Sequence, residues 1–115
     1  MPQTGPLEGH TALVTGASRG IGAATARALD RAGARLAVVS RGGPDLDEVA
    51  AALGHRPLAL AADLRQADAP GQVAARVLDG FGSVDILVNN AALAARLDTV
   101  DTEAALIDEL LAVNV

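Results

Sequence analysis

The stretch Thr11-Ala-Leu-Val-Thr-Gly-Ala-Ser-Arg-Gly-Ile-Gly22 decides the fold of this 115-residue chain. Its first residues, Thr11 to Val14, form a short apolar run that suits a strand buried on both faces, and a glycine-rich turn follows at once. Beyond the turn, apolar residues recur at helical spacing as far as Gly33, a residue type that commonly follows the end of a helix. A helix is therefore expected from Gly20 to about Ala32. Its regularly spaced residues are Ile21, Ala24, Thr25, Ala28 and Leu29.

The alternation of strand and helix repeats along the rest of the chain. Apolar runs at Arg35–Ser40, Leu58–Ala62 and Val84–Val88 predict three further strands, and a helix is predicted after each, with Pro44 and Pro70 in first turns, where proline is favoured. The apolar residues of these helices are Leu46, Val49, Ala50 and Leu53; Val73, Val77, Leu78 and Phe81; and Leu106, Ile107, Leu110, Leu111 and Val113. Four nearly all-apolar strands alternating with four helices predict an α/β fold, a doubly wound parallel sheet with helices on both faces.

Composition and charge exclude several classes of protein. The formal net charge is -5, which argues against a protein that binds the nucleic-acid backbone. No apolar run approaches the roughly 20 residues that span a bilayer, and the first six residues lack the basic and apolar parts of a signal peptide, so no membrane partner and a cytoplasmic location are expected. The chain has no cysteine, and His10 and His55 are interpreted as turn residues, so no metal site is expected. One domain is expected at residues 10–115, behind a leader at 1–9.

The strongest chemical signal is Thr15-Gly-Ala-Ser-Arg-Gly-Ile-Gly22, which lies between a predicted strand and a predicted helix. Glycines allow a tight turn and a close approach of the backbone to a pyrophosphate, while the free N–H groups and the dipole of the helix attract the anion. A turn that merely needs flexible residues is the alternative, but the strand before it and the helix after it favour a dinucleotide site. The loop is not a Walker loop, because no lysine follows it.

Two further motifs follow later strands at the same predicted edge of the sheet. Asn89-Asn90-Ala91-Ala92 comes directly after the predicted strand at Val84–Val88, and asparagines there can hold the neighbouring glycine-rich turn by side-chain hydrogen bonds. Asp63-Leu64 follows the third predicted strand. Taken alone, Asp63 would more often be a turn residue or a helix cap.

With these motifs the chain resembles the short-chain dehydrogenase/reductase family, whose cofactor motif TGxxxGxG is matched at Thr15, Gly16, Gly20 and Gly22. The family's Asn-Asn-Ala-Gly run is matched except for Ala92 in its last position, and Asp63 resembles its adenine-amino acceptor. The resemblance implies a Rossmann-type sheet of strand order 3-2-1-4, incomplete at its C-terminus, that binds NAD(P). The cofactor-binding residues that it implies are Thr15, Gly16, Ser18, Arg19, Gly20, Ile21, Gly22, Ser40, Arg41, Asp63, Leu64, Asn89, Asn90 and Ala91.

The resemblance also implies a parent oxidoreductase that interconverts a small-molecule carbonyl and an alcohol, as a homo-oligomer in its full-length form. The form TGASRGIG is similar to that of 3-oxoacyl-carrier-protein reductases, which leaves the substrate open. By resemblance Asn114 is the first catalytic residue, and a serine and a YxxxK segment would follow it. The sequence contains no tyrosine and no lysine. The chain alone is therefore expected to be inactive, and its uncovered strand at Val84–Val88 is expected to make it unstable or self-associating.

The end of the second predicted strand indicates a preference for NADP(H) over NAD(H). In the family that the chain resembles, NAD-preferring members have an aspartate at the end of the second strand, and it accepts hydrogen bonds from the ribose 2′-hydroxyl. This chain has Ser40 at that position, followed by Arg41. Arg19 lies inside the glycine-rich loop, so that two guanidinium groups can converge on a 2′-phosphate. The alternative for either arginine alone is a solvated turn residue.

Two other functions are weighed against the enzyme. A stand-alone dinucleotide-binding module that regulates and catalyses nothing is compatible with the same motifs, and saturable cofactor binding by the isolated chain would favour it. An S-adenosylmethionine methyltransferase on a similar sheet is disfavoured by the glycine spacing and by Asn89-Asn90-Ala91.

Overall fold

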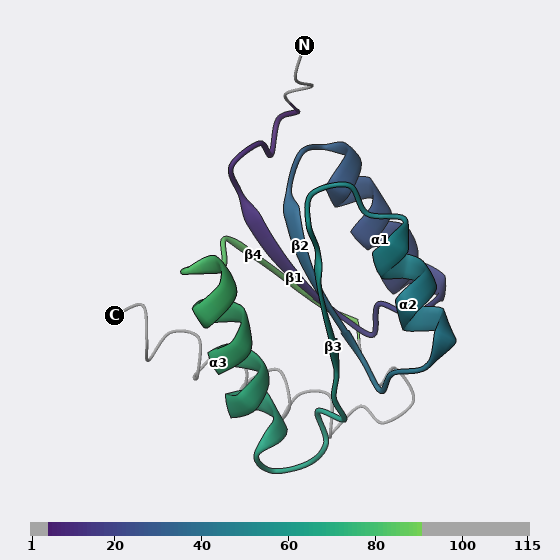
Figure 1. Ribbon diagram of the computed structural model, residues 1–115, viewed down its shortest axis with the longest axis vertical. Coiled ribbons are helices and arrows are strands. Elements are labelled where there is room, and N and C mark those ends of the chain that lie inside the picture. The colour runs from purple at the N-terminus through teal and green to yellow at the C-terminus, as the bar shows by residue number, and fades with distance from the viewer. Residues whose placement is uncertain (1–4, 91–115) are drawn as a thin grey trace.

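The computed structural model describes residues 5–90, which form a four-stranded parallel sheet with helices on both faces (Figure 1). The elements in chain order are β1 (Thr11–Thr15), α1 (Gly20–Arg31), β2 (Arg35–Ser40), α2 (Pro44–Ala51), β3 (Leu58–Ala61), α3 (Ala69–Phe81) and β4 (Ile86–Asn89). The strand order is β3-β2-β1-β4, and every neighbouring pair is parallel. The α/β class and the predicted order 3-2-1-4 are confirmed. Ala91, Asn114 and the fourth predicted helix lie outside the described residues.

The strand boundaries differ from the predicted ones where polar residues continue the ladder. β1 runs one residue further than predicted, because Thr15 pairs with Val39 of β2 and with Asn89 of β4. β4 begins at Ile86 and includes Asn89, whereas the apolar run at Val84–Val88 predicted an earlier start and end. Apolar pattern alone does not count the polar residues that a parallel ladder still pairs.

Two apolar layers lie on the two faces of the sheet, because successive strand residues point to opposite sides. Ala12 and Val14 of β1 pack with α1 and α2, whereas Leu13 between them packs with α3. Figure 1 shows the same division, with α1 and α2 on one side of the strands and α3 on the other. Within residues 5–90, no helix is long and apolar enough to cross a membrane.

The face of α1 that packs on the sheet is only partly the one that the sequence spacing indicates. The buried residues of α1 are Gly22, Ala23 and Ala26, whereas Ile21 of the regularly spaced set is 70% exposed and Leu29 of that set packs against the core. The cause is a close approach of the helix to the preceding loop, since a Cβ atom on Gly22 would lie 2.0 Å from the carbonyl oxygen of Gly16. No side chain fits at Gly22, so hydrophobic size is a misleading guide to the direction of the first turn of α1.

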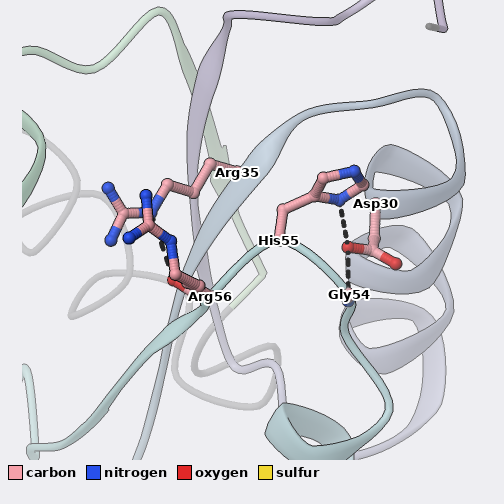
Figure 2. A network of polar contacts seen from close by, with 5 residues as sticks. All are labelled: Asp30, Arg35, Gly54, His55 and Arg56. Carbon is pink, nitrogen blue, oxygen red and sulfur yellow. Dashed lines mark hydrogen bonds and ion pairs between the residues drawn. The ribbon is translucent and has the colours of Figure 1, made fainter. Parts of the chain in front are cut away.

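Polar contacts connect segments near the amino ends of the strands, at the end of the sheet away from the glycine-rich loop (Figure 2). An oxygen of the Asp30 carboxylate accepts a hydrogen bond of 2.9 Å from the N–H of Gly54 and lies 2.9 Å from Nδ1 of His55. The Nε–H of Arg35 donates to the carbonyl oxygen of Arg56 at 3.1 Å. These contacts tie α1 and β2 to the segment that leads into β3. His55 is thus a partly exposed turn residue with a structural partner.

A matched pair of substitutions tests the close approach at Gly22. Gly22→Ala is expected to destabilise the fold by about 3 kcal/mol or more, because the new methyl group meets backbone that cannot rotate away. Gly80→Ala in α3 is the control, since its Cβ would lie 3.7 Å from a Leu58 methyl group, an ordinary contact. Helix propensity then makes Gly80→Ala stabilising by roughly 0.5–1 kcal/mol. Urea unfolding followed by circular dichroism measures both, and equal effects of the two changes would contradict the account.

Candidate functional site

The polar and glycine-rich motifs of the sequence meet at the carboxyl edge of the sheet. Because all four strands are parallel, the segments after β1, β2, β3 and β4 leave the sheet at the same edge. The predicted site residues that the structure places on these segments or at the adjoining strand ends and helix start are Thr15, Gly16, Ser18, Arg19, Gly20, Ile21, Gly22, Ser40, Arg41, Asp63, Leu64, Asn89 and Asn90. Residues separated by 75 positions in the sequence are thereby brought into direct contact.

The loop between β1 and α1 leaves the first N–H groups of α1 without a side-chain partner. Gly16 and Gly20 have positive φ angles of 61° and 63°, a conformation that favours glycine and that produces the tight turn. Arg19 is the N-cap of α1 but makes no side-chain capping hydrogen bond, and the first turn carries no acidic residue. Free N–H groups at the positive end of a helix dipole attract an anion. The local geometry therefore suits a phosphate group at the start of α1.

The side chain of Thr15 joins the carboxyl ends of β1 and β4. Its hydroxyl group is fully buried, donates to Oδ1 of Asn89 at 2.7 Å and accepts from the N–H of Asn90 at 3.0 Å. The side chain of Asn90 lies over Gly22, where an added Cβ atom would come within 2.9 Å of its Nδ2. The side chain of Asn89 is therefore bonded to the end of β1, whereas Asn90 is bonded to it through its backbone N–H. The Nδ2 group of Asn89 is buried and donates to no partner among residues 5–90.

Asp63 is held in a turn by Arg65, a partner that sequence reasoning missed. The backbone N–H and the Nε–H of Arg65 both donate to Oδ1 of Asp63 at 3.0 Å, and Nη2 donates to Oδ2 at 3.0 Å. These hydrogen bonds lower the pKa of the Asp63 carboxyl from 3.8 to about 2, with smaller help from the nearby Arg41 cation. The turn role weighed for Asp63 is therefore present in the structure. The spacing Asp-x-Arg in a turn is the signal that indicates such a clamp.

The arginines after β1 and β2 present exposed guanidinium groups at this edge. Arg19 and Arg41 are exposed, and neither makes a hydrogen bond or ion pair through its side chain with any residue that the structure describes. Ser40 is half-buried, and its Oγ accepts a hydrogen bond from the N–H of Gly42 at 3.2 Å. No carboxylate stands at the end of β2 itself. The two cations are thus available to an anionic ligand.

A groove of about 250 Å³ opens between α1 and α2, beside the glycine-rich loop. Its lining residues are Ser18, Arg19, Gly20, Ala23, Ala24, Arg27, Asp45, Glu48 and Val49. The contributions of Arg27, Asp45 and Glu48 were not predicted from the sequence. Their signal is the spacing of three or four residues within each helix, which places side chains on one face, but this spacing does not say that the two faces meet.

Two predicted site residues present their side chains differently from the rest. The side chain of Leu64 is buried, 7% exposed, in the apolar layer below α3, so any contact from Leu64 to a ligand would come from its backbone. Ile21 projects into solvent at the start of α1. Among residues 5–90 no group of three or more histidine, aspartate or glutamate side chains gathers in a way that would hold a metal ion.

Comparisons with known proteins agree on one family. The sequence profile of the short chain dehydrogenase family matches residues 10–115. A sorbitol dehydrogenase of Cereibacter sphaeroides is 41% identical over 109 residues, which are 95% of this chain and 43% of that protein. A variant of a short-chain dehydrogenase/reductase of Serratia marcescens has a TM-score of 0.82 and 34% identity, covering 93% of this chain and 51% of its own.

A further solved relative carries a cofactor. A metagenomic short-chain oxidoreductase in complex with NADP has a TM-score of 0.78 and 35% identity, and the match covers 93% of this chain and 57% of that one. The chain therefore spans about half the length of these proteins, from 43% to 57%.

The Arg65 clamp predicts an unusual titration of Asp63. Its carboxyl is expected to titrate near pH 2, and Arg65→Ala is expected to return the midpoint toward 3.8. Because the folded pKa lies below the unfolded one, the stabilisation is complete above about pH 4 and is lost as the pH falls through about 2. Carbon-detected NMR titration of the Asp63 side-chain carboxyl measures the midpoint in the wild-type protein and in the Arg65→Ala variant. A wild-type midpoint near 3.8 would contradict the clamp.

The Thr15 hydroxyl group predicts a contrast between two substitutions. Thr15→Val keeps the shape but leaves Asn89 Oδ1 and the Asn90 N–H without their partner, at an expected cost of about 2–4 kcal/mol in unfolding free energy. Thr15→Ser keeps the hydroxyl group and loses one methyl group, at an expected cost of about 1 kcal/mol. Chemical denaturation compares the two variants. If Thr15→Ser destabilises the protein as much as Thr15→Val, the methyl group rather than the hydroxyl group matters.

Proposed function

Because the chain belongs to the short-chain dehydrogenase family, we propose that the described residues are the cofactor-binding half of a nicotinamide-dependent oxidoreductase. The full-length protein would interconvert a carbonyl and an alcohol of a small molecule. The observation that carries the proposal is the convergence of four strand ends on the uncapped start of α1. A dinucleotide binds across such a switch point of an open parallel sheet.

The residues at the carboxyl edge fit a dinucleotide in charge and in shape. The pyrophosphate would lie on the loop from Gly16 to Gly22, where free N–H groups of α1 face it. The Thr15 hydroxyl group and the two asparagines would keep the end of β4 beside that loop. The Nδ2 of Asn89, which has no partner in the part of the chain that the structure describes, supplies a buried donor in the same region. A bound nicotinamide supplies the hydride, and the protein supplies position and charge.

Asp63 would accept a hydrogen bond from the adenine amino group while Arg65 holds its carboxylate. A carboxylate has about four lone-pair sites, and three of them are used by Arg65. The carboxyl group is ionised at neutral pH, and is therefore an acceptor only. The clamp thus fixes the direction of the acceptor and leaves capacity for one donor from the ligand.

The proposed enzyme prefers NADP(H) to NAD(H). The support is the absence of an acid at the end of β2, together with the exposed guanidinium groups of Arg19 and Arg41. Guanidinium groups bind phosphate by charge-assisted and bidentate hydrogen bonds. The NADP bound to one solved relative is compatible with this preference but does not establish it for this chain.

The proton-transfer residues of the reaction would come from outside the given sequence. Asn114 is proposed as a catalytic residue by family resemblance alone, and it lies outside the described residues. The 115 residues include no tyrosine and no lysine, so that the YxxxK pair of the family is missing from them. A positioned general acid increases the rate of such a reaction by roughly 10²–10⁴-fold. The 115-residue chain by itself would therefore bind a dinucleotide without turnover.

Binding and turnover by the 115-residue chain separate the enzyme from other classes. Titration calorimetry is expected to show saturable binding of NADPH, and a ketone panel is expected to give no consumption of NADPH above a protein-free blank. S-adenosylmethionine is the control ligand and is expected not to compete. Turnover in protein free of host reductases would contradict the assignment of the acid to residues outside this chain, and absent dinucleotide binding would contradict the proposed site.

The cofactor preference is tested in the full-length protein. The double change Ser40→Asp with Arg41→Ala is expected to lower the ratio of kcat/KM for NADPH over NADH by about 100-fold or more, since it adds a repulsive charge and removes a phosphate partner. Arg31→Ala, an exposed arginine at the other end of α1, controls for the loss of positive charge. A wild-type enzyme that favours NADH, or a double variant with an unchanged ratio, would contradict the role of these positions.

A further inference from the structure

We propose that Asp45 and Glu48 of α2 set an upper limit on the preference of this site for a 2′-phosphorylated dinucleotide. The inference rests on the proposed function and deepens it. Arg19 and Arg41 favour a phosphate group at the ribose 2′ position, whereas the two carboxylates oppose it. The site thereby retains affinity for NAD(H), although no acid stands at the end of β2.

The groove between α1 and α2 places opposite charges beside the phosphate-binding loop. Arg19 ends the loop and Arg27 lies two turns further along α1, while Asp45 and Glu48 stand one turn apart on α2. All four line the same open space of about 250 Å³, together with Ser18 and Gly20 of the loop. A ligand group that reaches the guanidinium of Arg19 from the loop therefore enters a space that the two carboxylates also border.

The carboxylates are not neutralised by close partners. None of the four charged side chains of the groove makes a hydrogen bond or an ion pair of 4.0 Å or less with residues 5–90. The side chains that line the groove carry two positive and two negative charges, which sum to zero. A 2′-phosphate dianion consequently gains from Arg19 but is repelled by Asp45 and Glu48, whereas a 2′-hydroxyl group carries no charge for them to repel.

Acids in the first turn of a helix have another ordinary use, which supplies a matched control. Asp45 and Asp47 both lie in the first turn of α2, where a negative charge stabilises the positive end of the helix dipole. Only Asp45 lines the groove, whereas Asp47 is exposed and does not line it. Removing the charge of either residue costs α2 about the same stabilisation. A difference in cofactor selectivity between the two variants therefore reports the groove and not the helix.

The test is the ratio of the dissociation constants for NADP⁺ and NAD⁺, measured by titration calorimetry on the full chain. Asp45→Asn and Glu48→Gln are each expected to tighten NADP⁺ binding about two- to tenfold, as Coulomb interaction with a dianion at neighbouring-residue distances in water predicts. The dissociation constant for NAD⁺ is expected to change by less than about twofold, because its 2′-hydroxyl group is neutral. Asp47→Asn is expected to leave the ratio unchanged, and Asp45→Glu is expected to keep the wild-type ratio.

Salt dependence gives a second readout that separates charge from shape. Near 1 M salt the Debye length falls to about 3 Å. The tightening of NADP⁺ binding by Asp45→Asn is therefore expected to disappear at that salt concentration. An unchanged ratio in both groove variants, or an equal shift in Asp47→Asn, overturns the inference while leaving the proposed function intact. Failure of the wild-type chain to bind either dinucleotide overturns the proposed function and this inference with it.

Discussion

The buried hydroxyl group of Thr15 is the interaction on which the carboxyl edge of this sheet depends. It is the last residue of β1, and its two hydrogen bonds reach Asn89 and Asn90 at the end of β4. Asn90 in turn lies over Gly22, and Gly22 packs against the carbonyl of Gly16. A buried hydroxyl group with both a donor and an acceptor role specifies one relative position for its neighbours, because any other leaves a polar group unsatisfied. The glycine-rich loop, the start of α1 and the end of β4 are thereby held as one unit.

That unit concentrates positive potential in an acidic protein. The formal net charge is -5, yet the carboxyl edge presents free N–H groups of α1 and the exposed guanidinium groups of Arg19 and Arg41. The acids nearest to it are either clamped, as Asp63 is by Arg65, or borne on the adjoining helix, as Asp45 and Glu48 are. Local arrangement therefore outweighs net charge in deciding what this edge can bind. The same arrangement places attraction and repulsion within one groove, which is how a site discriminates between two ligands that differ by a single phosphate group.

The motifs with a fixed spacing were the predictable part of the site. Thr15 to Gly22 and the paired asparagines lie where strand ends of a parallel sheet must meet, so their contact follows from topology and sequence together. The direction of α1 could not be predicted in the same way. Its regularly spaced residues include Ile21, which is exposed, whereas the helix approaches the loop at Gly22 too closely for any side chain to fit there. Hydrophobic periodicity measures side-chain size, whereas the close contact depends on the absence of a side chain.

The sequence by itself determined the parallel α/β sheet and the loop that faces an anion, because apolar runs and glycine spacing are local signals with a strong physical cause. The strand order came from the resemblance of its motifs to those of a known family. Only the tertiary structure decided which charges share a space. Arg65 reaches back to Asp63 through a turn, and the groove between α1 and α2 brings Arg19 and Arg27 beside Asp45 and Glu48. Electrostatic selectivity depends on the distances between charges in space and on their exposure to water. Neither quantity can be deduced from the spacing of residues along the chain.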